Sequence, residues 1–307
     1  MKVLHVGLCV NYKDEGLNYA LRQGFDDYWE LNTGEKNLND RILSMDGFNV
    51  AFFQIQSENI VSPATFAELK RRGVFTVNWS GDMRNGTPGW FFHTGADLTL
   101  FSNEQDVHNC RGRGMKADFL QIGIDPKAYN RFNEPRPARE VVFMANNYGG
   151  QFPLGGERQN LIRTLQSRYG NRFGVYGNGW QGAAGNLNAT SLEGQREEAR
   201  YYNSAKIAIN HSHFNCCRYT SDRMFRILGS GCFCLSHHYA GIEKDFAVGE
   251  HLVTYSGFHD LIGKIDYYLS NDADRQRIAN AGYLHCQANF TYKNMVHNLI
   301  NLIKRWQ

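Results

Sequence analysis

The sequence lacks the features that mark membrane-spanning, fibrous and disordered chains. None of its apolar runs approaches the roughly 18 to 20 residues that cross a bilayer. Only 6 of its 307 residues are proline, and it has no low-complexity segment or short-period repeat. With 42% hydrophobic and 21% charged residues, the composition is globular and excludes a collagen-like repeat, a coiled coil or a disordered tail. The length predicts about two domains.

The cysteines are too scattered for a disulfide framework. Their number, seven, is odd, and they are spread over a large chain, which indicates a reducing compartment. Residues 1–10 are apolar like the centre of a signal peptide, but Asn11, Lys13 and Asp14 follow without a small-residue cleavage site. We therefore expect a first strand here and a cytoplasmic protein.

An excess of charge of one sign is also missing. The formal net charge is +3 and the pI is near 8.4. A dedicated nucleic-acid-binding domain usually has a pI above about 9. The charge therefore permits a polyanionic partner without requiring one.

Apolar runs alternate with amphipathic ones along the chain, which predicts βα units and parallel sheets covered on both faces. In the first half we expect helices at 62–70 and 103–111, the former with Ser62 as its N-cap and Pro63 at its first position. Strands are expected at 2–8, 49–56, 75–79, 98–101 and 119–122.

Residues 123–138 interrupt this alternation with three prolines and several charges, so we predict a linker between two domains. The alternation then restarts. Two open α/β domains predict a cleft, with ligands at the carboxyl ends of the strands. In the second half, strands are expected at 140–144, 173–176, 206–210, 232–236 and 251–255, and helices at 158–168, 222–228, 261–269 and 293–306.

A glycine-rich stretch, residues 177–182 (GNGWQG), matches the dinucleotide-binding pattern G-x-G-x-x-G. Residues 183–188 have loop composition rather than helix composition, and no acidic ribose ligand ends a strand about twenty residues later. A nicotinamide enzyme is therefore disfavoured. The glycines still suit the close approach of a flat ligand, against which Tyr176 or Trp180 could stack.

Histidines and cysteines gather in the second half with spacing that does not suit a metal. No C-x2-C pair occurs, and Cys232 and Cys234 alternate with apolar residues as core side chains do. We predict buried cysteines and no metal site, while His211 and His213 could face the cleft. The whole group comprises His211, His213, Cys216, Cys217, Cys232, Cys234, His237 and His238.

The segment 219–235 carries the most informative pattern. Ser221 is an N-cap type before a short helix, Gly229 suits the helix end, and a buried strand follows Gly231. A helix N-terminus with a hydroxyl cap and Arg223 in its first turn is a ready site for a diphosphate. An ordinary αβ unit with an exposed arginine fits this segment equally well.

Several segments resemble, in collinear order, the CgeB-like (spore-maturation-type) glycosyltransferases. In the C-terminal half these are residues 223–231 (RMFRILGSG), 250–255 (EHLVTY), 261–269 and 290–292 (FTY). Upstream they are residues 60–69, 77–82, 123–126, 142–147 with Arg158, and 175–180. The resemblance covers nearly the whole chain.

This resemblance implies a GT-B fold, in which two Rossmann-like domains with parallel sheets face each other across a cleft. The acceptor domain is expected at 1–130, the nucleotide-sugar-binding domain at 139–290, and a helix that returns towards the first domain at 291–307. The family also implies no cofactor beyond a nucleotide-sugar co-substrate, of the UDP-sugar type. It implies no metal either, since a helix N-terminus and basic side chains neutralise the leaving diphosphate.

We therefore predict a glycosyltransferase that moves a sugar from a UDP-sugar to an acceptor hydroxyl. Arg223, Arg158 and the helix N-terminus at Ser221 are expected to hold the diphosphate. An inverting reaction needs a general base, for which Asp82 is the first candidate and His93 the second. The other expected donor-binding residues are Asn146, Tyr176, Gly177, Asn178, Gly179, Arg226 and Gly231.

Arg218 and Arg226 stand where many GT-B relatives carry two glutamates eight positions apart. Arginine cannot accept a hydrogen bond from a ribose diol. The ribose is then held by the loop at 229–231, by Glu243 or by Glu250. Alternatively the two arginines contact phosphate, or Arg226 points to solvent.

Two other functions stay open at this stage. The basic clusters 70–72 and 111–116 would suit a transferase that glucosylates a hydroxymethylated DNA base, although solvated helix ends have the same composition. The second alternative is a catalytically silent GT-B protein that only binds a nucleotide or a polymer.

Overall fold

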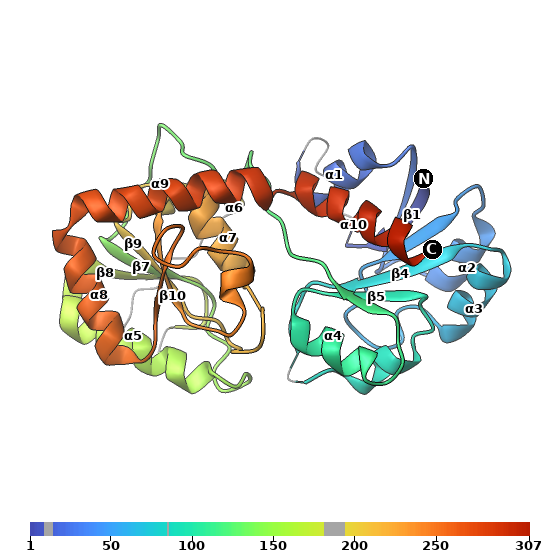
Figure 1. The fold of residues 1–307 in the computed structure, drawn as a ribbon, viewed down its shortest axis with the longest axis horizontal. Coiled ribbons are helices and arrows are strands. Elements are labelled where there is room, and N and C mark those ends of the chain that lie inside the picture. The colour runs from blue at the N-terminus through green and yellow to red at the C-terminus, as the bar shows by residue number, and fades with distance from the viewer. Residues whose placement is uncertain (9–14, 85, 181–193) are drawn as a thin grey trace. The chain divides into compact units, whose positions relative to one another are not determined.

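The computed structural model describes residues 1–8, 15–84, 86–180 and 194–307. The chain divides into two compact units (Figure 1). The first unit comprises Met1–Gly123 and Tyr292–Gln307, and the second comprises Ile124–Thr291. Each unit contains its own parallel sheet.

The sheet of the first unit has six parallel strands in the order β2-β1-β3-β4-β5-β6. Parallel strands need helical crossovers, so helices cover both faces. In β3, Val50 and Phe52 point into one core and Ala51 and Phe53 into the other. The strands are β1 (Lys2–Gly7), β2 (Asp27–Asn32), β3 (Val50–Phe53), β4 (Phe75–Ser80), β5 (Leu98–Phe101) and β6 (Ala117–Phe119).

The C-terminal helix α10 (Tyr292–Trp306) completes the first unit by packing beside α1 (Gly16–Gly24), as Figure 1 shows. The contact is close, since a Cβ on Gly24 would lie 2.4 Å from a methyl group of Val296. Helices α2 (Leu38–Ser44) and α3 (Pro63–Arg71) cover the opposite face, and α4 (Glu104–Arg111) packs against β5 and β6.

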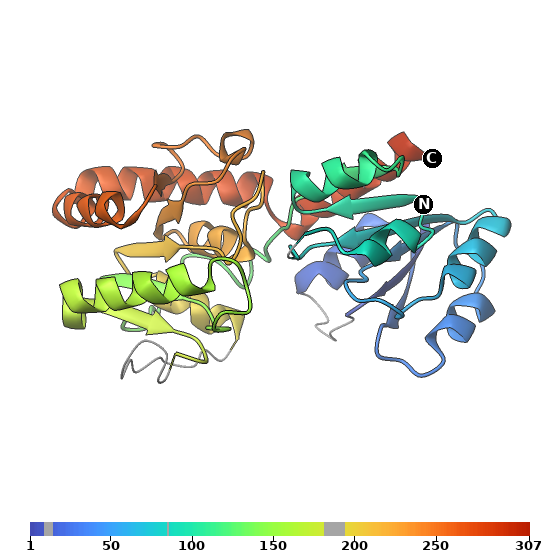
Figure 2. The same ribbon diagram turned by 90° about the horizontal axis from the view of Figure 1, so that it is seen from below.

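The sheet of the second unit has five parallel strands in the order β11-β10-β9-β7-β8. Figures 1 and 2 both show its strands between α5 and the long helix α9. The strands are β7 (Val141–Met144), β8 (Phe173–Tyr176), β9 (Ile207–Asn210), β10 (Phe233–His237) and β11 (Val253–Tyr255). The helices are α5 (Gly155–Tyr169), α6 (Gln195–Tyr202), α7 (Asp222–Gly229), α8 (Phe258–Ser270) and α9 (Asp272–Asn289).

The fold class expected from the sequence is confirmed: both units are Rossmann-like α/β units with parallel sheets. Cys232 and Cys234 are buried as predicted, at 2% and 0% exposure. The expected strand at 119–122 instead ends at Phe119 as β6. The strand β2 was missed, because an edge strand that carries Asp27 and Glu30 lacks the apolar run of a central strand.

The proline-rich segment after residue 123 belongs to the second unit and packs against the rest of it. Tyr129 is buried, and its hydroxyl group donates to Glu198 at 2.9 Å. The Asn203 side chain donates to the Asn130 carbonyl oxygen at 3.0 Å. Among the described helices, none combines the length and the apolar character that a membrane span requires.

A buried histidine makes the stability of the first unit depend on pH. His5 lies within β1, with Nδ1 2.7 Å from the Tyr28 hydroxyl and Nε2 2.7 Å from Gln54 Oε1. Burial lowers the pKa of His5 to about 4. Below about pH 6.5 the unfolded chain therefore takes up a proton that the folded chain refuses, and stability falls as pH decreases towards 4.

We predict that His5→Gln reduces this acid sensitivity. Between pH 7 and pH 5 the free energy of unfolding should fall by up to about 2 kcal/mol more in the wild type than in the variant, because only the wild type has this histidine to protonate on unfolding. Urea unfolding followed by tryptophan fluorescence measures this, because Trp29, Trp79, Trp90 and Trp306 all lie in the first unit. Equal pH dependence of the two proteins would contradict the prediction.

Candidate functional site at the carboxyl edge of the second sheet

The loops that follow β7 and β8 are hydrogen-bonded to each other. The Ala145 N–H donates to the Tyr176 carbonyl, and the Asn147 N–H to the Asn178 carbonyl, both at 2.8 Å. The Asn146 side-chain oxygen accepts from the Asn178 N–H at 2.9 Å. These contacts fix two of the loops at the carboxyl edge, where ligands bind in open α/β sheets.

Close approach of these two loops explains the glycine pattern. Gly177 and Gly179 have positive φ angles of 131° and 81°. A Cβ would lie 2.3 Å from the Ala145 carbonyl oxygen at Gly177, and 2.5 Å from the Asn147 carbonyl oxygen at Gly179. Backbone packing therefore accounts for both glycines without a dinucleotide. The third glycine of the pattern, Gly182, lies outside the described residues, as do residues 183–188.

Neither aromatic ring expected to stack on a ligand is exposed. Tyr176 is 6% exposed, and its ring packs against Tyr201 with the centroids 5.0 Å apart. Trp180 is fully buried, and its indole N–H donates to the Ala145 carbonyl oxygen at 2.6 Å. The predicted stacking platform is thus part of the protein interior.

Arg158 is a buried cation with incomplete hydrogen bonding. It is 1% exposed, and its Nη2 donates to the Asn146 carbonyl oxygen at 3.2 Å. Its Nε and Nη1 have no hydrogen-bond partner among the described residues. Burial, with the nearby charge of Arg223, lowers the pKa of Arg158 well below its ordinary value. An anion at this position would satisfy both the charge and the N–H groups.

Arg223 joins the ends of two neighbouring strands. Its Nε donates to the Met144 carbonyl oxygen at 2.8 Å, and its Nη1 to the His211 carbonyl oxygen at 3.1 Å. Arg223 and Arg158 each lie 5.2 Å from the centre of the Phe143 ring. The structure thus brings together the two arginines that the sequence assigned to one diphosphate. It also gives Arg223 a structural role that the sequence did not indicate.

The expected hydroxyl cap on α7 is not formed. Ser221 is the N-cap residue, but its side chain makes no capping hydrogen bond. Its hydroxyl group instead donates to Asn210 Oδ1 at 2.8 Å, and Asn210 Nδ2 donates to Ser236 Oγ at 3.0 Å. Ser221 therefore connects α7 to β9 and β10.

Two histidines follow β9, and neither is freely exposed. Burial, then the charges of His237, Arg158 and Arg223, lowers the pKa of His211 to about 2. Burial, then the same two arginines, lowers the pKa of His213 to about 3. Both imidazoles are therefore neutral near pH 7. Both ring nitrogens of His213 are buried without a partner among the described residues.

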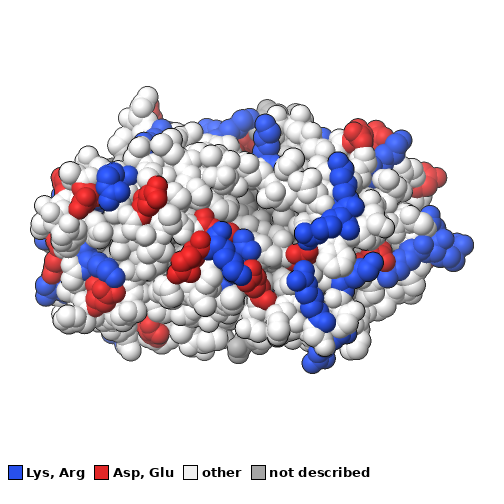
Figure 3. Space-filling view, in the orientation of Figure 1, with Lys and Arg blue, Asp and Glu red and all other residues white. Residues whose placement is uncertain are grey.

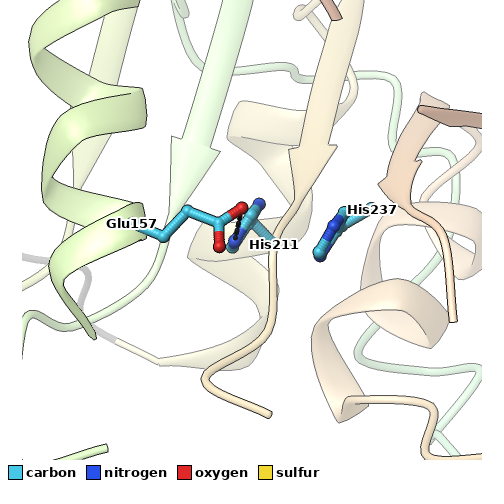
Figure 4. A group of neighbouring side chains, drawn as sticks. All are labelled: Glu157, His211 and His237. Carbon is cyan, nitrogen blue, oxygen red and sulfur yellow. Dashed lines mark ion pairs between the residues drawn. The ribbon is translucent and has the colours of Figure 1, made fainter. Parts of the chain in front are cut away.

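Glu157, His211 and His237 form a compact group (Figure 4). His211 Nε2 lies 3.5 Å from Glu157 Oε1, and the rings of His211 and His237 are parallel within 3° at 4.4 Å. His211 Nδ1 is 2.7 Å from the hydroxyl group of Tyr255. Glu157 and Tyr255 were not among the residues expected at the site, and the spacing of His237 did not suit a metal. The available signal was that His211, His237 and Tyr255 each end or follow a predicted strand.

Gly231 was expected at the donor site but lies at the other end of the sheet. It precedes β10, whereas the site surrounds the carboxyl ends of the strands. A Cβ on Gly231 would lie 2.3 Å from Arg131 Nε, and one on Gly229 would lie 2.3 Å from a methyl group of Ile124. Packing of the segment after residue 123 therefore explains this glycine pair, and the loop cannot hold a ribose at the carboxyl edge.

Arg218 and Arg226 are paired with carboxylates, and neither points freely to solvent. Arg218 donates to both oxygens of Asp245, at 3.0 and 2.8 Å. Arg226 contacts Glu198 at 3.2 Å and Asp222 at 2.5 Å. Burial alone would lower the pKa of Arg226, but these two carboxylates raise it above its ordinary value. The proposed alternatives for the ribose, Glu243 and Glu250, are both exposed, and Glu243 pairs with His238 at 3.3 Å.

Both candidate bases lie in the first unit and are exposed. Asp82 follows the carboxyl end of β4, where the Ser80 hydroxyl donates to its backbone carbonyl oxygen at 3.2 Å. His93 ends the 3₁₀ helix Gly89–His93.

Four side chains of the two basic clusters pair with carboxylates. Arg71 and Arg72 both pair with Glu68, and Lys70 pairs with Asp97 at 3.0 Å. Arg111 pairs with Asp118 at 3.3 Å. On the face that Figure 3 presents, basic and acidic side chains are mixed over the left half, and basic side chains predominate over the right half. These pairs do not support the DNA-modifying alternative.

Solved structures with a similar fold include a glycosyltransferase from Rickettsia africae, which aligns at a TM-score of 0.68 with 9% identity over 99% of this chain and 98% of its own. Anabaena HepE in complex with UDP and glucose aligns at a TM-score of 0.70 with 9% identity, covering 99% of both chains. Sucrose-phosphate synthase from Thermosynechococcus elongatus aligns at 0.64 with 10% identity and the same coverage. The chain has the GT-B fold. A UDP-forming trehalose-phosphate synthase from Burkholderia xenovorans aligns at 0.64 with 11% identity over 86% of this chain and 75% of its own.

At the sequence level, residues 158–301 match a family described as glycosyl transferase-like. This range begins at Arg158 and includes α7 and the carboxyl edge of the second sheet from β8 to β11. No curated protein matches the chain significantly in sequence.

We predict that Arg226→Glu destabilises the protein, because it places a third carboxylate beside Glu198 and Asp222. Loss of the partly buried pair should cost about 2 kcal/mol or more. Thermal unfolding measures the effect, with Arg163→Glu on the exposed side of α5 as the matched charge reversal. A melting temperature of Arg226→Glu equal to that of the control would contradict the ion-pair role.

Proposed function

We propose that this protein is a glycosyltransferase that transfers a sugar from a UDP-sugar to an acceptor hydroxyl group. The observation that carries the proposal is Arg158, a buried guanidinium group that lies near the Phe143 ring together with Arg223. Two of its nitrogens have no hydrogen-bond partner in the part of the chain that the structure describes. Neither arginine is paired with a carboxylate of residues 1–8, 15–84, 86–180 or 194–307, and two such cations at the carboxyl edge of a parallel sheet form a site for a polyanion.

Preorganised positive charge is what the reaction requires. When the glycosidic bond to the diphosphate breaks, negative charge builds up on the leaving group. Cations already held in place stabilise that charge without reorganisation. Arg223 is held by the carbonyl oxygens of Met144 and His211, and Arg158 by burial, so both meet this condition.

The comparisons support the same class of reaction. The glycosyl transferase-like match includes both arginines, and HepE has been solved with UDP-glucose as well as with UDP. Within this class, the collinear motifs at 142–147, 175–180 and 223–231 favour the CgeB-like branch. A silent nucleotide-binding protein is the alternative, and UDP-sugar turnover by the purified chain separates the two.

The donor can be identified by a thermal-shift panel of UDP, GDP, ADP and their sugars. A nucleotide at about 100 times its dissociation constant adds roughly 2.7 kcal/mol to stability. We expect the UDP compounds to give the largest shift. Equal shifts for all the nucleotides would contradict the assignment of uridine.

We predict that Arg158→Met weakens UDP binding without weakening the fold. Loss of charge-assisted hydrogen bonds to phosphate should raise the dissociation constant about tenfold or more. The melting temperature of the free protein should stay equal or rise, because a buried charge without a carboxylate partner is removed. Calorimetric titration with UDP and thermal unfolding together measure both effects.

The control is Arg163→Met on the same helix, whose guanidinium is exposed and donates to Asn160 at 3.1 Å. It should bind UDP as the wild type does. Unchanged UDP affinity in Arg158→Met would overturn the phosphate assignment. Loss of affinity together with a lower melting temperature would show that Arg158 acts through the fold instead.

For the acceptor side we propose Asp82 as the general base, with His93 as the second candidate. Asp82→Asn should lower UDP-sugar turnover by about a hundredfold or more, in the range of a lost general base, and leave UDP affinity unchanged. Asp46→Asn, at an exposed aspartate before β3, is the control. If Asp82→Asn turns over UDP-sugar normally and His93→Asn loses turnover, His93 is the general base instead.

A further inference from the structure

The group of Glu157, His211 and His237 poses a problem of proton placement. His211 is fully buried, and its Nε2 has no hydrogen-bond partner among the described residues. Nε2 lies 3.5 Å from Glu157 Oε1. If Nδ1 carries the ring proton and donates it to the Tyr255 hydroxyl, Nε2 presents a lone pair to a carboxylate. Two acceptors then face each other.

A proton or a metal cation between these atoms removes the conflict. A proton between them belongs to the other neutral tautomer, in which Nε2–H faces Glu157 and Nδ1 accepts from the Tyr255 hydroxyl group, whereas a metal ion requires the tautomer with a free Nε2. A neutral imidazole with a free Nε2 is the form that ligates metals. The hydrogen bond between Nδ1 and Tyr255 is also the outer contact that orients a metal-binding histidine.

The donor set and its geometry suit one particular class of ion. One ligand atom from each of Glu157, His211 and His237 lies within 4.8 Å of the other two. In a tetrahedral zinc site with bonds of about 2.0–2.1 Å, ligand atoms lie roughly 3.4 Å apart, so the ligand atoms of this group must approach by about 1 Å. The stacked rings of His211 and His237 must also turn out of their parallel arrangement, because both nitrogen lone pairs have to point at one ion. Two imidazoles and one carboxylate, with a fourth position open, form a donor set of catalytic zinc sites.

We propose that Glu157, His211 and His237 bind one divalent transition-metal ion of the zinc class. The three ligands are other side chains than the arginines assigned to the diphosphate, and the metal site goes beyond the proposed transferase function. Access is available, because the Glu157 side chain is 39% exposed and His237 borders a small pocket with Asn210 and Tyr239.

The surroundings predict which metals bind. Arg223 donates to the His211 carbonyl oxygen at 3.1 Å, and the positive field of its guanidinium group opposes any cation. Mg²⁺ and Ca²⁺ are held mainly by charge and prefer oxygen ligands, so we expect that they do not bind here. Zn²⁺ and Co²⁺ suit imidazole ligands and are expected to bind.

The test uses the full chain after treatment with a chelator and no nucleotide. Co²⁺ is titrated and followed by its visible absorption, and Zn²⁺ and Mg²⁺ are titrated by calorimetry. We expect one equivalent of Co²⁺ and of Zn²⁺ to bind, and Mg²⁺ not to bind. Glu157→Gln and His237→Ala should each weaken Zn²⁺ binding at least tenfold.

His238→Ala is the matched control, because His238 follows His237 and pairs with a different carboxylate, Glu243. This variant should bind Zn²⁺ as the wild type does. Glu157 is partly exposed, so Glu157→Gln tests the site even if a histidine variant fails to fold.

Three results would overturn the proposal. The first is no binding of Zn²⁺ or Co²⁺ by the wild type, which would indicate that the Nε2 proton is shared with Glu157. The second is equal affinity in the wild type, Glu157→Gln and His237→Ala. The third is a thiolate-to-cobalt charge-transfer band that persists in Glu157→Gln, which would place the metal on the half-buried Cys216 and Cys217.

Discussion

The carboxyl edge of the second sheet depends on the hydrogen bonds of Arg223. This side chain donates to the last carbonyl of β7 and to the carbonyl that follows β9, two strands that are neighbours in the sheet. It thereby fixes the backbone of His211, whose ring then meets Glu157 and His237. The same guanidinium group lies 5.2 Å from the centre of the Phe143 ring, and the guanidinium group of Arg158 lies at the same distance from it. One side chain from α7 thus positions both groups to which we assign ligands.

The arginines around α7 fall into two kinds according to their partners. Arg218 and Arg226 bind carboxylates, so their charges are compensated within the protein. Arg158 and Arg223 bind backbone carbonyl oxygens and an amide oxygen, which accept hydrogen bonds but carry no net charge. A buried cation without a carboxylate is costly to the fold. The second kind is therefore the one expected at a site for an anion.

Two sequence signals, apolar alternation and the family motifs, predicted different parts of the structure. Apolar alternation located the central strands, because their burial on both faces leaves a continuous apolar run. It missed β2, an edge strand, and α6, in which Arg196, Glu197 and Glu198 precede the first buried apolar side chain. The family resemblance assigned Arg158 and Arg223 to one diphosphate, because both lie in segments that match the family. The motifs could not show that Arg226 pairs with Glu198, because Glu198 lies in α6 and Arg226 in α7, and only the fold brings the two helices together.

The glycines show the limit of motif analysis most clearly. A pattern of glycines reports that something approaches the backbone closely, but it does not say what approaches. At Gly177 and Gly179 the approaching group is the loop after β7, and at Gly229 it is Ile124. The metal group was hidden for a related reason. Its members are 54 and 26 residues apart in the sequence, and only the order β10-β9-β7 brings them together.

The two proposed ligands also constrain each other through charge. Two guanidinium groups and a divalent cation would concentrate positive charge around His211, which Glu157 alone does not offset. A diphosphate bound to Arg158 and Arg223 supplies the missing negative charge. Each ligand should then lower the free energy of binding the other, and linkage requires the two effects to be equal. A GT-B site built on uncompensated arginines can therefore accept a cation most readily when its donor is already bound.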